Sequence, residues 1–154
     1  MTFEELKQIV NDSLEELRRM DAYLLEHNLN ERSISHKLSC YIGKRIEDWD
    51  VDAEYNRNMD DQKRLTPSDK SGVMPDIIVH RRGQNNYNGT EENNLLVIEI
   101  KKIPTASERK KDILKLKKFI KNSPYHYKYG AFIAFDGSEM EWFCRDSKNL
   151  DCEE

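Results

Sequence analysis

The chain has 154 residues, of which 25 are Lys or Arg and 29 are Asp or Glu, and its formal net charge at pH 7 is −4. This length favours one domain with one core and excludes a multi-domain enzyme. Charged residues make up 35% of the chain, but the apolar residues fall in periodic blocks, which argues against a disordered protein. No apolar run approaches the roughly 18 residues of a membrane-spanning helix, so membrane insertion is not expected.

The start of the chain and the cysteines indicate the compartment. The first residues lack the basic segment and apolar core of a secretory signal, so we expect a cytoplasmic protein. The three cysteines, Cys40, Cys144 and Cys152, are odd in number and include no C-x-x-C pair. This pattern argues against a disulfide framework or a structural zinc cluster and predicts reduced thiols.

The N-terminal part is patterned for two helices. Residues 3–26 carry apolar side chains at three- and four-residue steps, and Thr2 forms a capping box with Glu5, which predicts one long amphipathic helix. A second helix is expected over 31–45, with an asparagine as its cap. The apolar stripe of the first helix consists of Phe3, Leu6, Val10, Leu17, Met20 and Leu24.

From Trp49 the period of the pattern changes to two. Residues 49–56 alternate between apolar and polar side chains, as in a half-exposed strand. After a polar loop, strands are expected over 73–80 and 94–102, joined into a hairpin by the asparagine-rich turn 83–93. The strand 94–102 is apolar on both faces and therefore belongs at the centre of the sheet.

Pro104 interrupts the chain, and a third helix is expected over 106–122, followed by strands over 129–135 and 139–145. The expected order is therefore two helices, three strands, one helix and two strands. This order predicts an α/β domain with a sheet flanked by helices.

A carboxylate and an ammonium stand at the end of the central strand. Alternation places Glu99 and Lys101 on one face, roughly 7 Å apart along the strand. Desolvating such charges is costly unless a partner or a metal compensates them, so the pair indicates a functional site. Pro75-Asp76 opens the preceding strand, and the hairpin would bring its carboxylate beside Glu99.

Two carboxylates and a lysine suit a magnesium-dependent phosphodiester hydrolase. Mg²⁺ binds hard oxygen ligands and keeps several waters, so Asp76, Glu99 and the carbonyl of Ile100 would hold it against a phosphate. The metal would polarise the phosphoryl oxygens and lower the pKa of a bound water, while Lys101 would orient that water or neutralise developing charge. Mn²⁺ is expected to substitute for Mg²⁺.

At these residues the chain resembles the PD-(D/E)xK nuclease superfamily, the restriction-endonuclease-like group. Pro75-Asp76 stands at the PD position and Glu99-Ile100-Lys101 at the ExK position. The resemblance implies a restriction-endonuclease-like mixed β-sheet flanked by helices and a Mg²⁺-dependent deoxyribonuclease. Many members carry a further Glu on the first core helix, and Glu31 would match it as an additional metal ligand and catalytic residue.

The resemblance spans residues 28–136 of a single domain that covers 1–154. It leaves 1–27 as a long N-terminal helical extension and 137–154 as a C-terminal strand with an acidic tail. The matching order is a helix, three antiparallel strands, a crossover helix and a strand parallel to its neighbour.

Several of these residues have a second interpretation. Glu99 and Lys101 could be a solvated pair at a strand end, and Glu31 could complete a capping box with Asn28. His80, on the same face of its strand as Asp76, and Asp112, near the edge of the site, are expected just behind the metal ligands.

The basic charge is concentrated in residues 101–130, which carry ten Lys or Arg and two acidic residues, a formal charge of +8 that leaves −12 for the rest of the chain. Because the ExK strand leads into helix 106–122, its basic face is expected to bind DNA phosphates, with a solubilising face as the alternative. Tyr125 and Tyr127 add expected stacking surfaces. The DNA-binding lysines are Lys110, Lys111, Lys115, Lys117 and Lys118, and Lys115 also reaches toward the site.

These observations favour a metal-dependent DNA endonuclease. One alternative is a catalytically weak or inactive module that binds nucleic acid or protein, and another is a subunit of a larger defence or recombination assembly. Metal binding would distinguish the two hypotheses, because a nuclease should bind Mg²⁺ or Mn²⁺ at Asp76 and Glu99, whereas a binding module need not. The apolar stripe of the first helix favours a homodimer, because enzymes that cut both strands commonly need two active sites. Packing of this helix on its own domain is the alternative.

Overall fold

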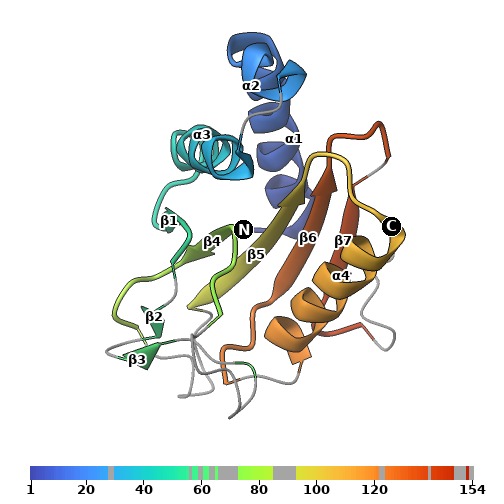
Figure 1. Ribbon diagram of the computed structural model, residues 1–154. Helices are drawn as coiled ribbons and strands as arrows, with labels where there is room; N and C mark the ends of the chain where they lie inside the picture. Colours follow the sequence, from blue (N-terminus) through green and yellow to red (C-terminus); the bar gives the residue numbers. More distant parts are fainter. Residues whose placement is uncertain are drawn as a thin grey trace.

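A mixed sheet lies between two layers of helices in a computed structural model of the chain (Figure 1). The structure describes residues 1–27, 30–55, 57–58, 61–62, 65, 73–84, 93–121, 124–138, 140–147 and 152. Within this part the main sheet has five strands in the order β1-β4-β5-β6-β7. The pair β5–β6 is parallel, and the pairs β1–β4, β4–β5 and β6–β7 are antiparallel. The prediction of a mixed α/β domain flanked by helices is confirmed.

The main sheet is centred on the strand that the sequence places there. β5 is buried along nearly its whole length between β4 and β6, which confirms the expectation from its two apolar faces. A separate two-stranded sheet, β2 with β3, occupies part of the segment expected to be a loop. The strands are β1 (Asp50–Ala53), β2 (Arg57–Asn58), β3 (Asp61–Gln62), β4 (Ile77–His80), β5 (Asn94–Lys101), β6 (Tyr129–Ala134) and β7 (Glu141–Cys144).

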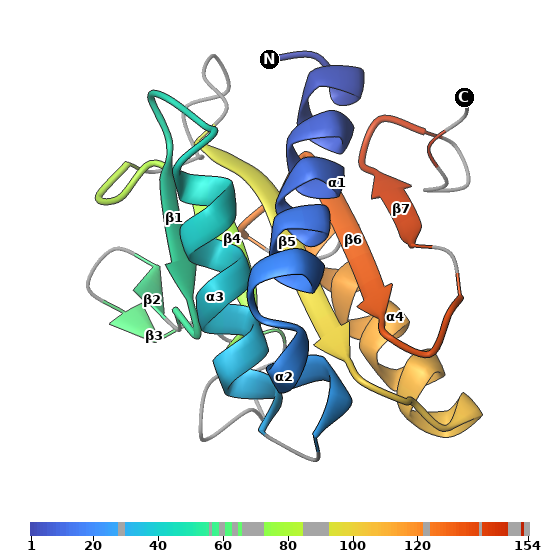
Figure 2. The same ribbon diagram turned by 90° about the horizontal axis from the view of Figure 1, so that it is seen from above.

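Helices α1 (Phe3–Met20) and α3 (Glu31–Gly43) lie over one face of the sheet (Figure 2). The predicted capping box at Thr2 is present, with the Glu5 N–H donating to the Thr2 hydroxyl and the Glu5 carboxylate accepting from the Thr2 N–H. Leu6, Val10 and Leu17 are fully buried in the core that this helix layer shares with the sheet. Leu6, Val10 and Leu17 of the apolar stripe thus pack on their own domain, whereas Met20 is exposed.

The prediction of one unbroken helix over 3–26 is wrong at Asp21. There the chain leaves the helical conformation (φ −125°, ψ 32°), and a short helix, α2 (Ala22–Glu26), follows. The Asp21 carboxylate accepts a hydrogen bond from the Tyr41 hydroxyl on α3 and lies 3.6 Å from the Lys37 ammonium. These contacts with α3 favour the break in the helix. The local spacing of apolar residues does not predict them.

Helix α4 (Ala106–Lys121) covers the opposite face of the sheet. Leu116, Phe119 and Ile120 pack in a second core with Tyr125 and Tyr127. Because both tyrosines are buried, the expectation that they offer stacking surfaces is wrong. Among the described residues no helix combines the length and the apolar character that crossing a membrane requires.

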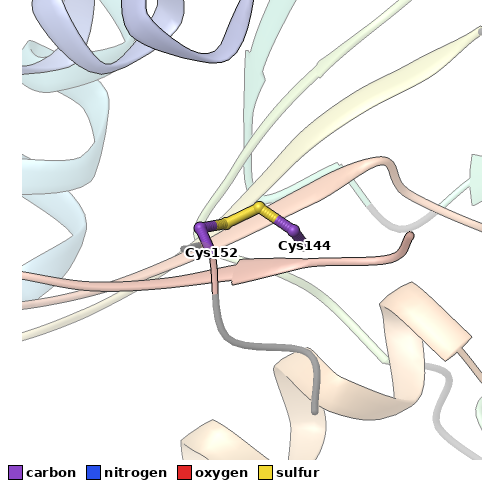
Figure 3. Close-up of a disulfide and its surroundings, with 2 residues drawn as sticks. All are labelled: Cys144 and Cys152. Carbon is purple, nitrogen blue, oxygen red and sulfur yellow. A yellow bond between two sulfur atoms is a disulfide. The ribbon is translucent and has the colours of Figure 1, made fainter. Parts of the chain in front are cut away.

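Cys144, at the end of β7, forms a disulfide with Cys152 (Figure 3). Their Cα atoms are 5.1 Å apart, within the usual range for a disulfide. Cys40 remains an exposed free thiol. The prediction of three reduced thiols is therefore wrong for one pair, because pairing depends on a Cα separation that sequence spacing does not reveal.

Candidate functional site

The hairpin of β4 and β5 brings the two expected carboxylates together. Its register pairs Ile77 with Ile98, so Asp76, just before β4, comes opposite Glu99. Asp76 Oδ2 accepts a hydrogen bond of 2.7 Å from the N–H of Ile100. Asp76 therefore sits against the Glu99-Ile100-Lys101 segment, where the sequence pattern places it.

The backbone of Ile100 faces the same place. In an extended strand the N–H and C=O of one residue point toward the same neighbouring strand. Since the Ile100 N–H donates to Asp76, the carbonyl of Ile100 also points toward the β4 side of β5, next to the segment that precedes β4. An oxygen donor of the backbone thus accompanies the two carboxylates, as expected for a metal ligand.

The side chain of Glu99 is almost completely buried, with 4% of its surface exposed. Its Oε2 accepts a hydrogen bond of 2.9 Å from the Lys115 ammonium on α4. Oε1 lies 2.8 Å from the same nitrogen, but it accepts no well-oriented hydrogen bond from any described residue. Burial raises the pKa of Glu99 to about 8, with the charge of Lys115 opposing the rise and that of Asp76 adding to it.

Asp76 is subject to the same competition between burial and neighbours. Burial raises the pKa of its carboxyl, while the hydrogen bond from Ile100 and the charges of Lys115 and Lys101 lower it. The net pKa lies above the ordinary value. Two neighbouring carboxyl groups with raised pKa values indicate a site where an additional cation would be stabilising.

Lys101 points between two further carboxylates. Its Nζ lies 3.1 Å from Glu31 Oε2 and 3.8 Å from Asp112 Oδ2. Partial burial lowers the pKa of Lys101, but the hydrogen bond and charge of Glu31 and the charges of Asp112 and Asp76 outweigh it and raise the pKa. Lys101 is therefore a charged group held at the end of β5.

Glu31 reaches the site from the first residue of α3. Besides Lys101, its carboxylate accepts a 3.2 Å hydrogen bond from the Lys102 N–H. The cap of α3 is Asn30, whose side chain accepts from the Arg32 N–H, whereas Asn28 lies outside the described residues. Glu31 therefore contacts the ExK segment through its ion pair with Lys101.

Asp112 lies near the site, whereas His80 lies away from it. Asp112 is buried on the α4 face toward the site, and its Oδ2 has no hydrogen-bond partner among the described residues. His80 lies at the far end of β4, where its Nε2 is 2.8 Å from Asp52 Oδ2. The expectation that His80 stands behind the metal ligands is wrong, because sharing a strand face with Asp76 leaves them four residues apart.

The five lysines expected to bind DNA do not share one environment. Lys110, Lys111 and Lys118 are exposed on α4. Lys117 is partly buried, with its ammonium 5.2 Å from the centre of the Phe143 ring. Lys115 points inward to Glu99. The sequence signal for this contact is the position of Lys115 three residues after Asp112, on the face of α4 toward the sheet.

The donor set fits a hard divalent cation. Among the described residues, the carboxylates of Glu31, Asp76, Glu99 and Asp112 interact with two ammonium groups, those of Lys101 and Lys115, which leaves an excess of negative charge when all are ionised. Mg²⁺ is typically held by one or two carboxylates, with water and substrate phosphate as its other ligands. Within the described ranges no three His, Cys, Asp or Glu side chains are grouped closely enough to hold a metal on their own. A cation at Asp76 and Glu99 would therefore need further oxygen ligands, such as water, to complete its coordination.

No family model, no curated protein and no solved structure matches the chain.

Proposed function

We propose that the protein is a metal-dependent DNA endonuclease with a restriction-endonuclease-like core. The observation that carries the proposal is the meeting of Asp76 and Glu99 at the end of the central strand, with Lys101 beside them. The order α3, β1, β4, β5, α4, β6 supports the assignment of the core, since β5 and β6 are parallel across the helix α4.

Asp76, Glu99 and the Ile100 carbonyl are the groups that would hold the cation. When bound, Mg²⁺ or Mn²⁺ polarises a phosphoryl oxygen and lowers the pKa of a coordinated water. Both carboxyl groups must be ionised to act as ligands, and because the pKa of Glu99 is raised to about 8, cation binding at neutral pH releases a proton from this group.

Lys101 supplies a positive charge close to the carboxylate pair. Its role would be to orient the attacking water or to neutralise charge that develops on the phosphate. Glu31 is a positioning residue, because it contacts the Lys101 ammonium at 3.1 Å and fixes it relative to the strand end. Asp112 restrains the same ammonium from the opposite layer.

The substrate is expected to approach along α4. Lys110, Lys111 and Lys118 are exposed on the helix that follows the ExK strand, and their positive charges complement a phosphate backbone. The rest of the chain carries a net negative charge, which makes the basic helix the more favourable surface for a polyanion.

A second candidate is a binding module without turnover. The pairing of Lys115 with Glu99 and of Lys101 with Glu31 favours it, because these two carboxylates each have a cationic partner without any metal. Cleavage separates the two candidates. The nuclease should nick or cut DNA only with Mg²⁺ or Mn²⁺, whereas the module would bind DNA and leave it intact.

The test is incubation of purified protein with plasmid, single-stranded and branched DNA, with and without Mn²⁺. Asp76→Asn and Glu99→Gln should abolish cleavage, while Glu15→Gln, which alters an exposed carboxylate on α1, should not. Equal cleavage by the parent and by Glu99→Gln would reject the proposed function and point to a contaminating nuclease.

A further inference from the structure

Lys115 is the nearest cationic partner that the structure gives to the buried carboxylate of Glu99. Its ammonium lies 2.9 Å from Oε2 and 2.8 Å from Oε1, and it also donates a hydrogen bond of 3.0 Å to the carbonyl of Met74. These three oxygens come from β5 and from the segment that leads into β4. Carboxylate and backbone carbonyl oxygens are typical ligands of a hard cation, so the ammonium occupies a position that would also suit a metal ion.

The same side chain also borders a surface pocket. This pocket has a volume of about 400 Å³ and is lined on the α4 side by Lys110, Lys111, Lys115 and Lys118 around the apolar side chains of Leu114 and Val73. About a quarter of the Lys115 side chain is exposed. A rotation about its flexible stem would move the ammonium from Glu99 toward the other lysines without displacing the helix.

We propose that Lys115 is an exchangeable partner of Glu99: it pairs with Glu99 while no divalent cation is bound, and it turns into the lysine-lined pocket when a cation takes its place. This inference rests on the proposed function, because it assumes the cation site at Asp76 and Glu99. Its consequence is that cation binding adds a fourth ammonium to the surface that faces the phosphate backbone. Metal binding and substrate binding would then favour each other.

Acetylation of the parent chain tests the exchange directly. A protein treated with an amine-acetylating reagent, with and without saturating Mn²⁺ and in the absence of DNA, would be digested, and modification would be quantified by mass spectrometry at Lys115 and Lys118. We expect Mn²⁺ to speed the modification of Lys115 about tenfold, the equivalent of one charge-assisted hydrogen bond. The rate at Lys118, which lines the pocket on the same helix, should not change.

Calorimetric titration with Mn²⁺ provides the second measurement. Lys115→Met should bind Mn²⁺ about tenfold more tightly than the parent, because no ammonium has to leave Glu99. Lys118→Met, which removes the same charge from the same pocket, should bind like the parent.

The outcomes distinguish this inference from the proposed function. If Mn²⁺ binds to the parent but leaves the Lys115 modification rate unchanged, the exchange is wrong and the nuclease proposal stands. If Lys115→Met binds Mn²⁺ no better than the parent, the exchange is likewise rejected. If neither chain binds Mn²⁺, the proposed function fails together with the exchange.

Discussion

The carboxylate of Glu31 lies 3.1 Å from the ammonium of Lys101, seventy residues later in the chain. This pair connects the first residue of α3 to the last residue of β5, so the helix layer on one face of the sheet contacts the end of the ExK segment. The carboxylate is bound to the lysine and to the Lys102 N–H, which favours a positioning role for Glu31 over that of a primary metal ligand.

Glu31→Gln should therefore reduce cleavage about tenfold or more, since Lys101 loses its charged partner, while Mn²⁺ affinity stays within a factor of about three. Its cost in stability should be below about 1 kcal/mol, because both partners are about a third exposed. Kinetics and Mn²⁺ titration of the same preparation provide the check. A loss of Mn²⁺ affinity as large as that of Asp76→Asn would identify Glu31 as a metal ligand instead.

The raised pKa of Glu99 predicts a pH-dependent stability. Between the ordinary carboxyl value of 4.5 and about 8, the folded state keeps a proton that the unfolded state has lost. The free energy of unfolding should therefore fall as the pH rises through this window, by at most about 1.4 kcal/mol per pH unit from this group. Urea unfolding in EDTA at pH 6 and pH 9 measures the effect.

Glu99→Gln should lose part of this pH dependence and should be the more stable chain at pH 9, because it carries no buried charge there. Glu15→Gln serves as the matched control and should follow the parent at both pH values. The same slope in Glu99→Gln and in the parent would show that Glu99 titrates normally in the folded chain.

The exposed lysines of α4 should determine the salt dependence of DNA binding. Replacing Lys110, Lys111 and Lys118 by Gln should weaken binding and reduce the slope of log affinity against log salt by up to about 2.7, since each duplex phosphate contact contributes about 0.9. A matched variant with Gln at Lys7, Lys37 and Lys44, in the α1 and α3 layer, should keep the parent slope. An unchanged slope in the α4 variant would assign these lysines to solubility alone.

The disulfide between Cys144 and Cys152 closes a short loop, eight residues apart in sequence. Reduction should lower the free energy of unfolding by about 2–3 kcal/mol through the entropy of the unfolded chain. Urea unfolding with and without dithiothreitol measures this loss. Cys40→Ser should retain it, whereas a double Cys144→Ser, Cys152→Ser variant should be insensitive to the reductant, and a sensitive double variant would contradict the assignment.

The features that could be predicted from sequence are those that depend on neighbours along the chain. The central position of β5 followed from apolar residues on both of its faces, and the meeting of Asp76 with Glu99 followed from a hairpin between two recognisable strands. Alternation and turn chemistry act over a few residues, so one sequence contains their whole signal.

Other features depend on partners that are distant in sequence. The break at Asp21 is favoured by Tyr41 on another helix, and the ion pair of Lys115 joins α4 to Glu99 on a strand. The position of Lys115 on its helix predicts that it reaches toward the site, but not which carboxylate it pairs with. The disulfide was missed for the same reason, since its Cα separation is a property of the fold.

The proposed role of Asp76 and Glu99 is to hold a divalent cation together. Calorimetric titration of Mn²⁺ into the parent chain, Asp76→Asn, Glu99→Gln and the control Glu15→Gln measures this binding. We expect one binding site in the parent and in Glu15→Gln, and its loss in both site variants, each of which should remain folded. Binding of equal strength in all four chains, or in none of them, would contradict this role.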